Sequence, residues 1–413
     1  MAETSAPASR AMRFREFVFL VAALMACQAL AIDAMLPALP TIAHALGVTD
    51  ENHAQWIVTV YLVGLGCGQF FWGLLSDRFG RRIVLLIGVA LYMVAALACG
   101  LSSSFTSLLA LRFIHGVAAA SVVVARSMIR DLYSGREMAR VMALTFIVFL
   151  MVPIIAPSIG QLILLVGTWR DLFVMFSVFA VVVWVWMLAR LRETLHPEYR
   201  MPLNARAILA ASARVLTDRT SICYTLAVGA VFGSVIAYVG MAQQIFDLVF
   251  HRAALMPTMF ALCAAAMGAA SFLNSRIVGR VGTRRVSQSG LLAFIAVTIA
   301  HSLWAYFGLE TLLTFVLFQG ATLAGVGLVA SNFGAMAMEP MGAIAGVAAS
   351  LQGFISTAGG AAVAALVGRT FNGSTLPLAA GAALCGVSAL VLVLLAEQGR
   401  LFRPHHAPSA QAH

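Results

Sequence analysis

Twelve long apolar stretches alternate with shorter polar segments along the chain. A helix needs ~20 predominantly apolar residues to cross the hydrocarbon core of a bilayer, and each stretch is about that long. The pattern therefore predicts an all-α polytopic membrane protein with twelve transmembrane helices. The stretches run at about 17–40, 55–76, 83–101, 106–126, 141–166, 171–189, 220–246, 256–278, 286–307, 311–336, 343–368 and 376–396.

One polar segment, residues 190–219, is much longer than the others and carries six arginines. It divides the apolar stretches into two sets of six, as expected for a secondary transporter built from two six-helix bundles. The predicted order is a cytoplasmic N-terminal tail at 1–16, an N-terminal bundle at 17–189, a central cytoplasmic loop at 190–219, a C-terminal bundle at 220–396 and a cytoplasmic C-terminal tail at 397–413.

The composition excludes several classes of protein. Of the 413 residues, 62% are hydrophobic and 10% are charged, whereas a soluble domain is about 45–50% apolar and about 25% charged. A soluble enzyme, a disordered chain and a disulfide scaffold are therefore excluded. The six cysteines lie singly within apolar stretches, so neither a metal site nor a disulfide framework is expected.

The net charge of +10 comes from 26 basic residues that are all arginine. If the N-terminus is placed inside, 22 arginines fall on inner segments, three fall on outer loops, and Arg112 lies inside an apolar stretch. Basic residues concentrate in the cytoplasmic loops of membrane proteins, so we expect both termini in the cytoplasm and a location in the inner (plasma) membrane. This distribution indicates contact with anionic lipid rather than with nucleic acid. A signal peptide cleaved after Ala31 is the alternative, but it would leave eleven spans and change which loops face the cytoplasm.

A short loop motif occurs in both halves of the chain. The sequence GLLSDRFGRR at 73–82 follows the second stretch, and GRVGTRR at 279–285 follows the eighth, displaced by 202 residues. Such repetition is typical of transporters built from two related bundles. The halves differ in charge, because Asp33, Asp77 and Arg112 have no charged counterparts in the second half.

The loop at 73–82 is a candidate gate. Its glycines permit close packing and a sharp turn, and its acid can meet an arginine or the N-terminus of another helix. Such contacts would hold the cytoplasmic side shut and break when it opens. The alternative is a positively charged turn that only sets topology. The candidate gating residues are Gly73, Asp77, Arg78, Gly80, Arg81 and Arg82.

Only two charged residues lie well inside the apolar stretches, Asp33 in the first and Arg112 in the fourth. Both are expected about 10 Å below the outer ends of their helices, where they can pair directly or through water. Ionisable groups at such depth are costly and usually line a transport pathway. We predict that Asp33 takes up and releases a proton under the influence of Arg112; the alternative is a static ion pair. His115, one turn deeper, is either a proton relay or a core histidine.

Polar and aromatic residues within the other stretches are candidates for substrate contact, although the same residue types also serve packing. Two prolines and a glycine in the fifth stretch predict a kinked or locally broken helix, although membrane helices also tolerate prolines without function. The candidate substrate residues are Gln28, Asp33, Tyr61, Tyr238, Asn332 and Phe333, and the kink residues are Pro153, Pro157 and Gly160.

Four motifs together resemble the major facilitator superfamily, specifically the twelve-span drug:proton antiporters of the Bcr/CflA type. The loop at 73–82 is similar to the family motif G-x-L-x-D-R-x-G-R-R. Residues 111–116 are similar to R-x-x-Q-G with histidine in place of glutamine, and residues 32–40 to D-x-Y-L-P-A-L-P with methionine in place of the aromatic residue. Residues 156–161 keep part of the fifth-helix motif G-P-x-x-G-G.

The resemblance implies proton-coupled efflux (antiport) of amphipathic drugs or related small molecules by alternating access. Asp33 would be the site of the proton and of a cationic substrate, Arg112 its coupling partner, and Asp77 with Arg78 and Arg81 the gate. The proton gradient is the expected energy source, without cofactor or metal. Nucleotide use is not expected, since a chain without lysine has no G-x-x-x-x-G-K-[ST] loop. The expected partners are a small-molecule substrate and membrane lipid, and the expected state is a monomer.

Two rival functions share the predicted fold. One is a proton-coupled exporter of a metabolite such as a sugar or an amino acid. The other is an uncoupled facilitator, in which Asp33 and Arg112 are structural and transport ignores a pH gradient. An intramembrane enzyme is not expected, because the chain has neither an H-E-x-x-H nor a G-x-S-x-G motif.

Overall fold

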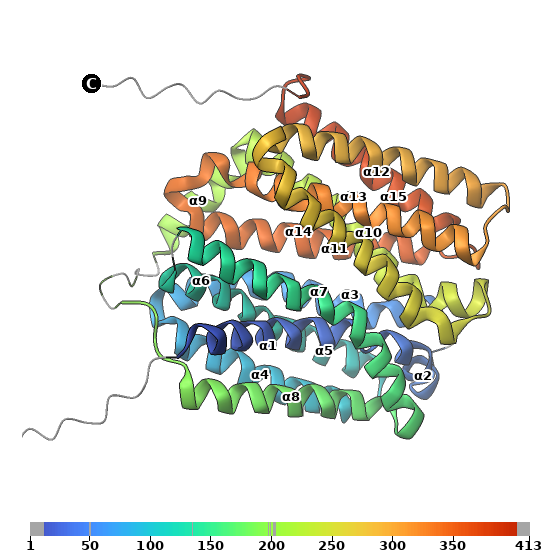
Figure 1. Cartoon of the computed structure of the whole chain (residues 1–413). Helices are drawn as coiled ribbons and strands as arrows, with labels where there is room; N and C mark the ends of the chain where they lie inside the picture. The colour runs from blue at the N-terminus through green and yellow to red at the C-terminus, as the bar shows by residue number, and fades with distance from the viewer. Residues whose placement is uncertain are drawn as a thin grey trace, which may run out of the picture.

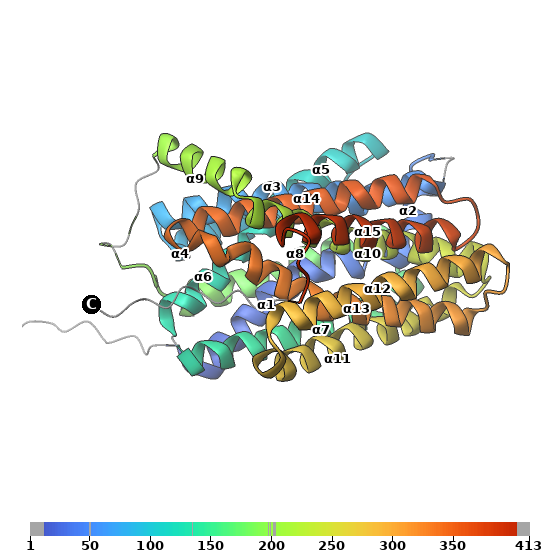
Figure 2. The same cartoon turned by 90° about the horizontal axis from the view of Figure 1, so that it is seen from above.

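The computed structural model describes residues 12–48, 51–133, 135–196, 198, 200 and 204–402. The described chain folds into long helices that lie roughly along one axis (Figures 1 and 2). The elements before residue 200 are α1 (Phe14–Asp33), η1 (Leu36–Ala38), α2 (Leu39–Ala45), η2 (Glu51–Gln55), α3 (Trp56–Phe79), α4 (Arg81–Gly100), α5 (Phe105–Ala119), η3 (Ala120–Val122), α6 (Val123–Leu132), α7 (Gly135–Val166) and α8 (Trp169–Arg190). Those after it are α9 (Ala205–Thr217), α10 (Arg219–Gln244), η5 (Ile245–Val249), η6 (Ala253–Leu255), α11 (Met256–Val281), α12 (Thr283–Tyr306), α13 (Leu312–Met338), η7 (Glu339–Ile344), α14 (Ala345–Arg369) and α15 (Leu376–Ala396).

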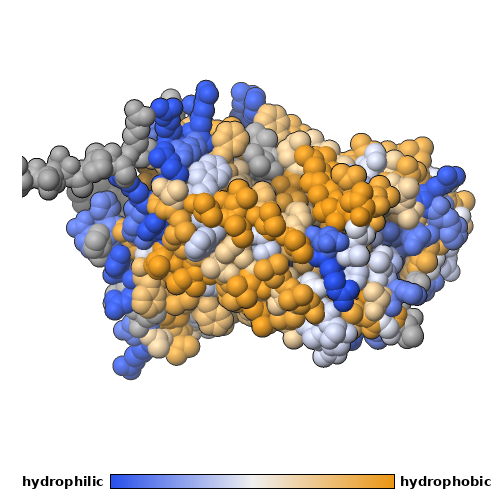
Figure 3. Space-filling view, turned by 90° about the horizontal axis from the view of Figure 1, so that it is seen from below, coloured by the Kyte–Doolittle hydropathy of each residue, from blue (hydrophilic) through white to orange (hydrophobic). Residues whose placement is uncertain are grey.

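These elements form twelve apolar helical segments. Eleven are long and apolar enough to cross a membrane, and α7 is the twelfth, with a described apolar part at Met151–Val166. The first span combines α1, η1 and α2, and the fourth combines α5, η3 and α6. Figure 3 shows a broad apolar band between more hydrophilic ends. The predicted all-α membrane fold is confirmed.

The helices form two bundles that lie side by side. In Figure 1 the helices α1 to α8 occupy the lower half, and α10 to α15 occupy the upper half. The bundles meet where α3 packs on α14 and where α7 packs on α11. Helix α9 and helix α2 lie at opposite ends of the molecule in both views (Figures 1 and 2), and these ends are called the α9 end and the α2 end.

The segment between the bundles, predicted as a loop, contains helix α9. Asn204 caps it by accepting hydrogen bonds from the N–H groups of Arg206 and Ala207. Val215 in its last turn is buried against Ala348 of α14. The segment that connects the bundles therefore includes a helix, because an amphipathic stretch covers an apolar surface there.

Two sharp turns occupy equivalent places in the two bundles. Gly80, between α3 and α4, has φ +101°, and Gly282, between α11 and α12, has φ +96°. These values lie in a region that glycine enters without steric cost. The displacement of 202 residues seen in the sequence therefore relates two turns of the same shape.

Glycines also set the distances between helices. A Cβ at Gly116 of α5 would overlap the carbonyl oxygen of Tyr61 on α3, and a Cβ at Gly160 of α7 would overlap that of Ala34, just after α1. Helix α7 continues through Pro153 and Pro157, so of the predicted kink or local break, the break is absent and the kink stays a prediction. The glycine of this motif serves close packing between α7 and the end of α1.

Gly160→Ala should destabilise the fold by about 1–3 kcal/mol, because a methyl group placed against a backbone carbonyl overpacks the interface. The measurement is the thermal unfolding temperature of the purified chain in detergent. Gly279→Ala is the matched control, since a Cβ there has nothing within 4 Å. Equal unfolding temperatures for the two variants would contradict the close approach.

Candidate functional site

Arg112 is fully buried, and its guanidinium connects three helices of the N-terminal bundle. Its Nη2 donates to the carbonyl oxygen of Ala31 on α1 at 3.1 Å, and its Nε donates to that of Ile57 on α3 at 3.2 Å. The guanidinium carbon lies 4.2 Å from the centre of the Tyr61 ring, a cation–π contact. Arginine has five donors and no acceptor, so backbone carbonyl oxygens can satisfy its hydrogen bonds.

The end of α1 explains why a carbonyl is free for Arg112. The last four carbonyls of a helix have no partner within it, and Ala31 is one of these residues because α1 ends at Asp33. Pro37, four residues further on, has no N–H with which to continue the helix. Arg112 thus caps a helix whose end is set by a proline.

Asp33 makes no direct pair with Arg112, so of the two arrangements that their matched depths predict, pairing directly or through water, the direct one is absent. The Asp33 side chain is 6% exposed. No described residue donates a hydrogen bond to its carboxylate or lies within ion-pairing distance of it. The donors of the guanidinium are directed to the carbonyls and to His115 instead. Asp33 and Arg112 are thus expected at a similar depth in the membrane, but the two side chains do not contact each other.

His115 is buried next to Arg112, and its ring orientation bears on the proposed relay. Its Nδ1 lies 3.1 Å from the Arg112 Nη1. Since arginine only donates, Nδ1 accepts and Nε2 carries the hydrogen. That Nε2 has no partner among the described atoms, and the ring packs 4.3 Å from the ring of Tyr92. Protonation would place two cations in contact, so this geometry favours a core histidine that positions Arg112.

Three of the predicted substrate residues lie inside the C-terminal bundle. Tyr238 stacks on Phe260 with 5.3 Å between ring centres, and Asn332 donates to Asn274 at 2.8 Å. Phe333 is fully buried. In this conformation they serve packing, because the helix faces that carry them point into their own bundle.

The two other candidates lie in the N-terminal bundle and face different surroundings. Tyr61 is fully buried beneath Arg112, and its hydroxyl donates to the backbone carbonyl of Gln28 at 3.2 Å. The Gln28 side chain lines a cavity between the bundles. Of the predicted substrate residues, Gln28 is thus the one placed on this cavity.

The cavity has a volume of about 290 Å³ and reaches from the middle of α1 to the α9 end of α3. Its walls come from α1, α3, α6 and α7 of one bundle and α14 of the other. Gln28 and Gln69 supply amides, and Arg126 and Arg130 of α6 supply guanidinium groups. Arg126 is the last residue of the fourth predicted apolar stretch, whereas α6 continues to Leu132.

At the α2 end the bundles are joined by side chains. Gln55 of η2 donates to Gln244 of α10 at 2.5 Å, and a Cβ at Gly368 of α14 would overlap the Gln55 amide. A crevice of about 590 Å³, lined in part by His44 and Asp247, lies beside this junction.

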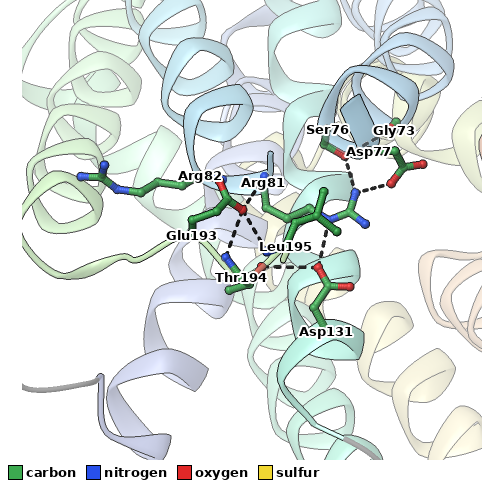
Figure 4. A network of polar contacts seen from close by, with 9 residues as sticks. All are labelled: Gly73, Ser76, Asp77, Arg81, Arg82, Asp131, Glu193, Thr194 and Leu195. Carbon is green, nitrogen blue, oxygen red and sulfur yellow. Dashed lines mark hydrogen bonds and ion pairs between the residues drawn. The ribbon is translucent and has the colours of Figure 1, made fainter. Parts of the chain in front are cut away.

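The loop at 73–82 forms a polar network at the α9 end (Figure 4). Arg81 is 3% exposed; its Nε donates to Asp131 at 2.9 Å, and its Nη1 donates to Ser76 at 2.7 Å and to Asp77. Asp131 lies in the last turn of α6, and Ser76 and Asp77 lie in α3. Arg81 therefore connects the fourth span to the second.

Glu193, just after α8, binds the start of α4. Its carboxylate accepts the backbone N–H groups of Arg81 at 2.8 Å and Arg82 at 3.1 Å, as Figure 4 shows. A helix N-terminus has unpaired N–H groups and a partial positive charge. The Glu193 carboxylate accepts hydrogen bonds from these N–H groups, and its negative charge is favourable at the positive end of the helix. It thereby connects the segment after α8 to the third span.

Asp77 extends the network across the interface between the bundles. A Cβ at Gly346, the second residue of α14, would lie 3.6 Å from the Asp77 Oδ2. The carboxylate thus faces the N-terminus of a helix in the other bundle. Gly73, one turn earlier, lies against Ser350 so closely that a Cβ would displace the hydroxyl. Arg78, by contrast, is exposed and has no partner among the described residues.

The C-terminal bundle has its own arginine network. Arg284, in the turn equivalent to 73–82, donates to Glu397 at 2.8 Å and to Glu339 at 3.1 Å. Glu397 directly follows α15, and Glu339 directly follows α13. In the corresponding spans of the first bundle, Glu193 follows α8 and Asp131 lies in the last turn of α6. No described contact links this second network to the other bundle.

Comparison with known proteins agrees with this architecture. The sequence profile of the Major Facilitator Superfamily matches residues 21–365. The chain belongs to the major facilitator superfamily. It is 32% identical to the uncharacterized MFS-type transporter YdgK of Bacillus subtilis, over 85% of this chain and 88% of the relative. It is 28% identical to a bicyclomycin resistance protein homolog of Haemophilus influenzae, over 84% and 87% of the two chains.

Solved structures of the superfamily share the fold. The xylose transporter XylE from E. coli, in a partially occluded inward open conformation, matches with a TM-score of 0.71 at 13% identity, over 94% of this chain and 98% of that one. The predicted resemblance to transporters of the Bcr/CflA type is confirmed by the resistance-protein relative. This superfamily member is a multi-pass membrane transporter and not an enzyme.

Two carboxylates of this transporter's network, Asp131 and Glu193, were not found from the sequence. Each directly follows an arginine at the end of a span, so the basic residues dominated the interpretation of these segments. The acids bond to Arg81 across separations of 50 and 112 residues. The signal that identifies them is an acid directly after an arginine in an inner segment, as in Arg130-Asp131 and Arg192-Glu193.

Arg81→Gln should destabilise the transporter by about 1–3 kcal/mol, because it leaves two carboxylates without their charged partner. Arg78→Gln removes the same charge from the same loop and should have little effect, since its side chain is exposed. Thermal unfolding of both variants in detergent measures the difference. If both unfold at the native temperature, the network around Arg81 contributes nothing to stability.

Proposed function

We propose that this transporter exports amphipathic drugs or related small molecules across the cell inner membrane in exchange for protons. Both termini would lie in the cytoplasm, so that the α9 end is cytoplasmic and the α2 end is external. The energy source would be the proton gradient alone, and the working unit a monomer in contact with lipid and one small-molecule substrate.

The observation that carries the proposal is the Asp33 side chain, a buried carboxyl group without a donor. An ionised carboxylate is very costly in such a place, whereas a protonated one is tolerated. A group in this position gains a proton when it is enclosed and loses it when water or a cation reaches it. Ionisable residues inside membrane helices commonly mark proton relays.

The arrangement of the bundles supports alternating access. They are joined by Gln55 and Gln244 at the α2 end, and they enclose the cavity with Gln28 toward the α9 end. Rocking of one bundle against the other would close the cavity at one end and open it at the other. The contacts of Asp77 with the start of α14 would break in that movement.

The relatives favour drugs over other substrates. A homolog of a bicyclomycin resistance protein matches over most of both chains, and drug exporters bind amphipathic compounds in apolar cavities with few polar groups. The rivals are a metabolite exporter with the same coupling and an uncoupled facilitator.

Asp33→Asn should abolish proton-driven accumulation of chloramphenicol or a lipophilic cation in inverted membrane vesicles, a loss of at least about tenfold, since an amide cannot carry the proton. Its thermal stability should stay at the native value, because Asp33 has no partner to lose. Asp218→Asn, which removes a charge but keeps an N-cap residue at the start of α10, is the matched control and should transport normally.

Each rival predicts a different result in the same vesicles. Accumulation that is indifferent to the pH gradient and to Asp33 would identify an uncoupled facilitator. Gradient-driven accumulation of a sugar or an amino acid, with none of the drugs, would identify a metabolite exporter. Lower stability in Asp33→Asn would indicate a structural role for the carboxylate.

A further inference from the structure

The cavity between the bundles has two arginines on one face of α6. Arg126 and Arg130 are four residues apart, so they project from the same side of the helix, and both line the cavity. Arg126 lies six residues before the end of α6 at Leu132, which is about 9 Å along the helix axis. It is therefore well inside the fourth span.

Neither guanidinium has a hydrogen-bond or ion-pair partner among the described residues, and both are exposed to the space around them. Three other arginines near this end are engaged by acids, whereas Arg78, which also has no described partner, is exposed at the end of α3. The pairs are Arg81 with Asp131, Arg190 with Glu16, and Arg284 with Glu397. An arginine that only marks topology reaches the polar surface at the helix end, whereas Arg126 lines the space between the bundles.

The two glutamine amides of the cavity are neutral groups that can donate or accept hydrogen bonds. The side chains of Gln28 and Gln69 make no hydrogen bond to a described residue. Asp77 is the acid among the described lining residues, and Arg81 already engages it. The free charge that the cavity offers to a ligand is thus positive.

We propose that this cavity binds the anionic end of an amphipathic substrate, such as a carboxylate, with Arg126 as its direct ligand and Arg130 as a second cation nearer the entrance. Guanidinium groups bind carboxylates through paired, charge-assisted hydrogen bonds. The amides of Gln28 and Gln69 would orient the rest of the molecule. This inference rests on the proposed function in naming the ligand as a transport substrate. Its ligand is an anion bound at Arg126, whereas the family resemblance implies a cationic substrate at Asp33.

Two fluorescent probes of nearly the same size test the proposal on the full-length chain in phosphatidylcholine nanodiscs. Dansyl glycine carries a carboxylate, and dansyl glycinamide is its neutral amide. A charge-assisted pair should make the native chain bind dansyl glycine at least about tenfold more tightly. Arg126→Gln should reduce that preference to about twofold or less, and Arg126→Lys should keep part of it, since it keeps the charge but loses the paired geometry.

Arg285→Gln is the matched control, because Arg285 is exposed in the first turn of α12 and does not line the cavity; it should keep the native preference. If the native chain binds the two probes equally, this result alone overturns the proposal, and no variant is needed. A preference that survives in a folded Arg126→Gln variant also overturns it, because the anion then binds elsewhere.

The outcome is separable from that of the proposed function. Asp33→Asn should bind dansyl glycine as the native chain does. Carboxylate preference without proton-driven transport of any compound supports the site and contradicts the antiporter. Proton-driven transport of neutral drugs without carboxylate preference supports the antiporter and contradicts the site.

Discussion

Arg112 determines how the N-terminal bundle accommodates its buried charges. Its guanidinium donates hydrogen bonds to the carbonyl oxygen of Ala31 on α1 and to a carbonyl oxygen of α3. The Ala31 carbonyl is unpaired within the helix because α1 ends before Pro37. A charged group at this depth must be satisfied by the protein. Because backbone oxygens do so here, the carboxylate of Asp33 has no counterion among the residues that the structure describes. The arginine thus holds helices together, whereas the acid has no partner in the described part of the chain.

Contact between the bundles depends on small residues along α3 and α14. Gly353 faces Gln69, Ser350 faces Gly73, and Gly346 faces Asp77. Small side chains let helix backbones approach without interlocking, so the surfaces can slide or separate without unpacking either bundle. The charged contact is confined to one end of this line, where Asp77 meets the start of α14.

The sequence determined the spans and several local features. Hydrophobic length predicted the membrane helices, and the glycines of the 73–82 loop predicted a sharp turn and close packing, which Gly80 and Gly73 provide. Equal depth failed to predict the contacts of Asp33, because pairing depends on where each side chain points around its helix. The apolar pattern ends at Arg126 and the helix does not, so the sequence predicts an arginine of the inner surface where the structure has one that lines the cavity.

The paired networks of Arg81 and Arg284 have a consequence for how the chain is made. Each network is completed by acids from its own half, at Glu193 in the first and at Glu397 in the second. The first bundle therefore contains every acid that Arg81 bonds to once residue 193 has been synthesised. It can reach its final packing while the second is still being synthesised, as N-terminal domains commonly do. The order of the two bundles along the chain thus permits an order of assembly, the first before the second.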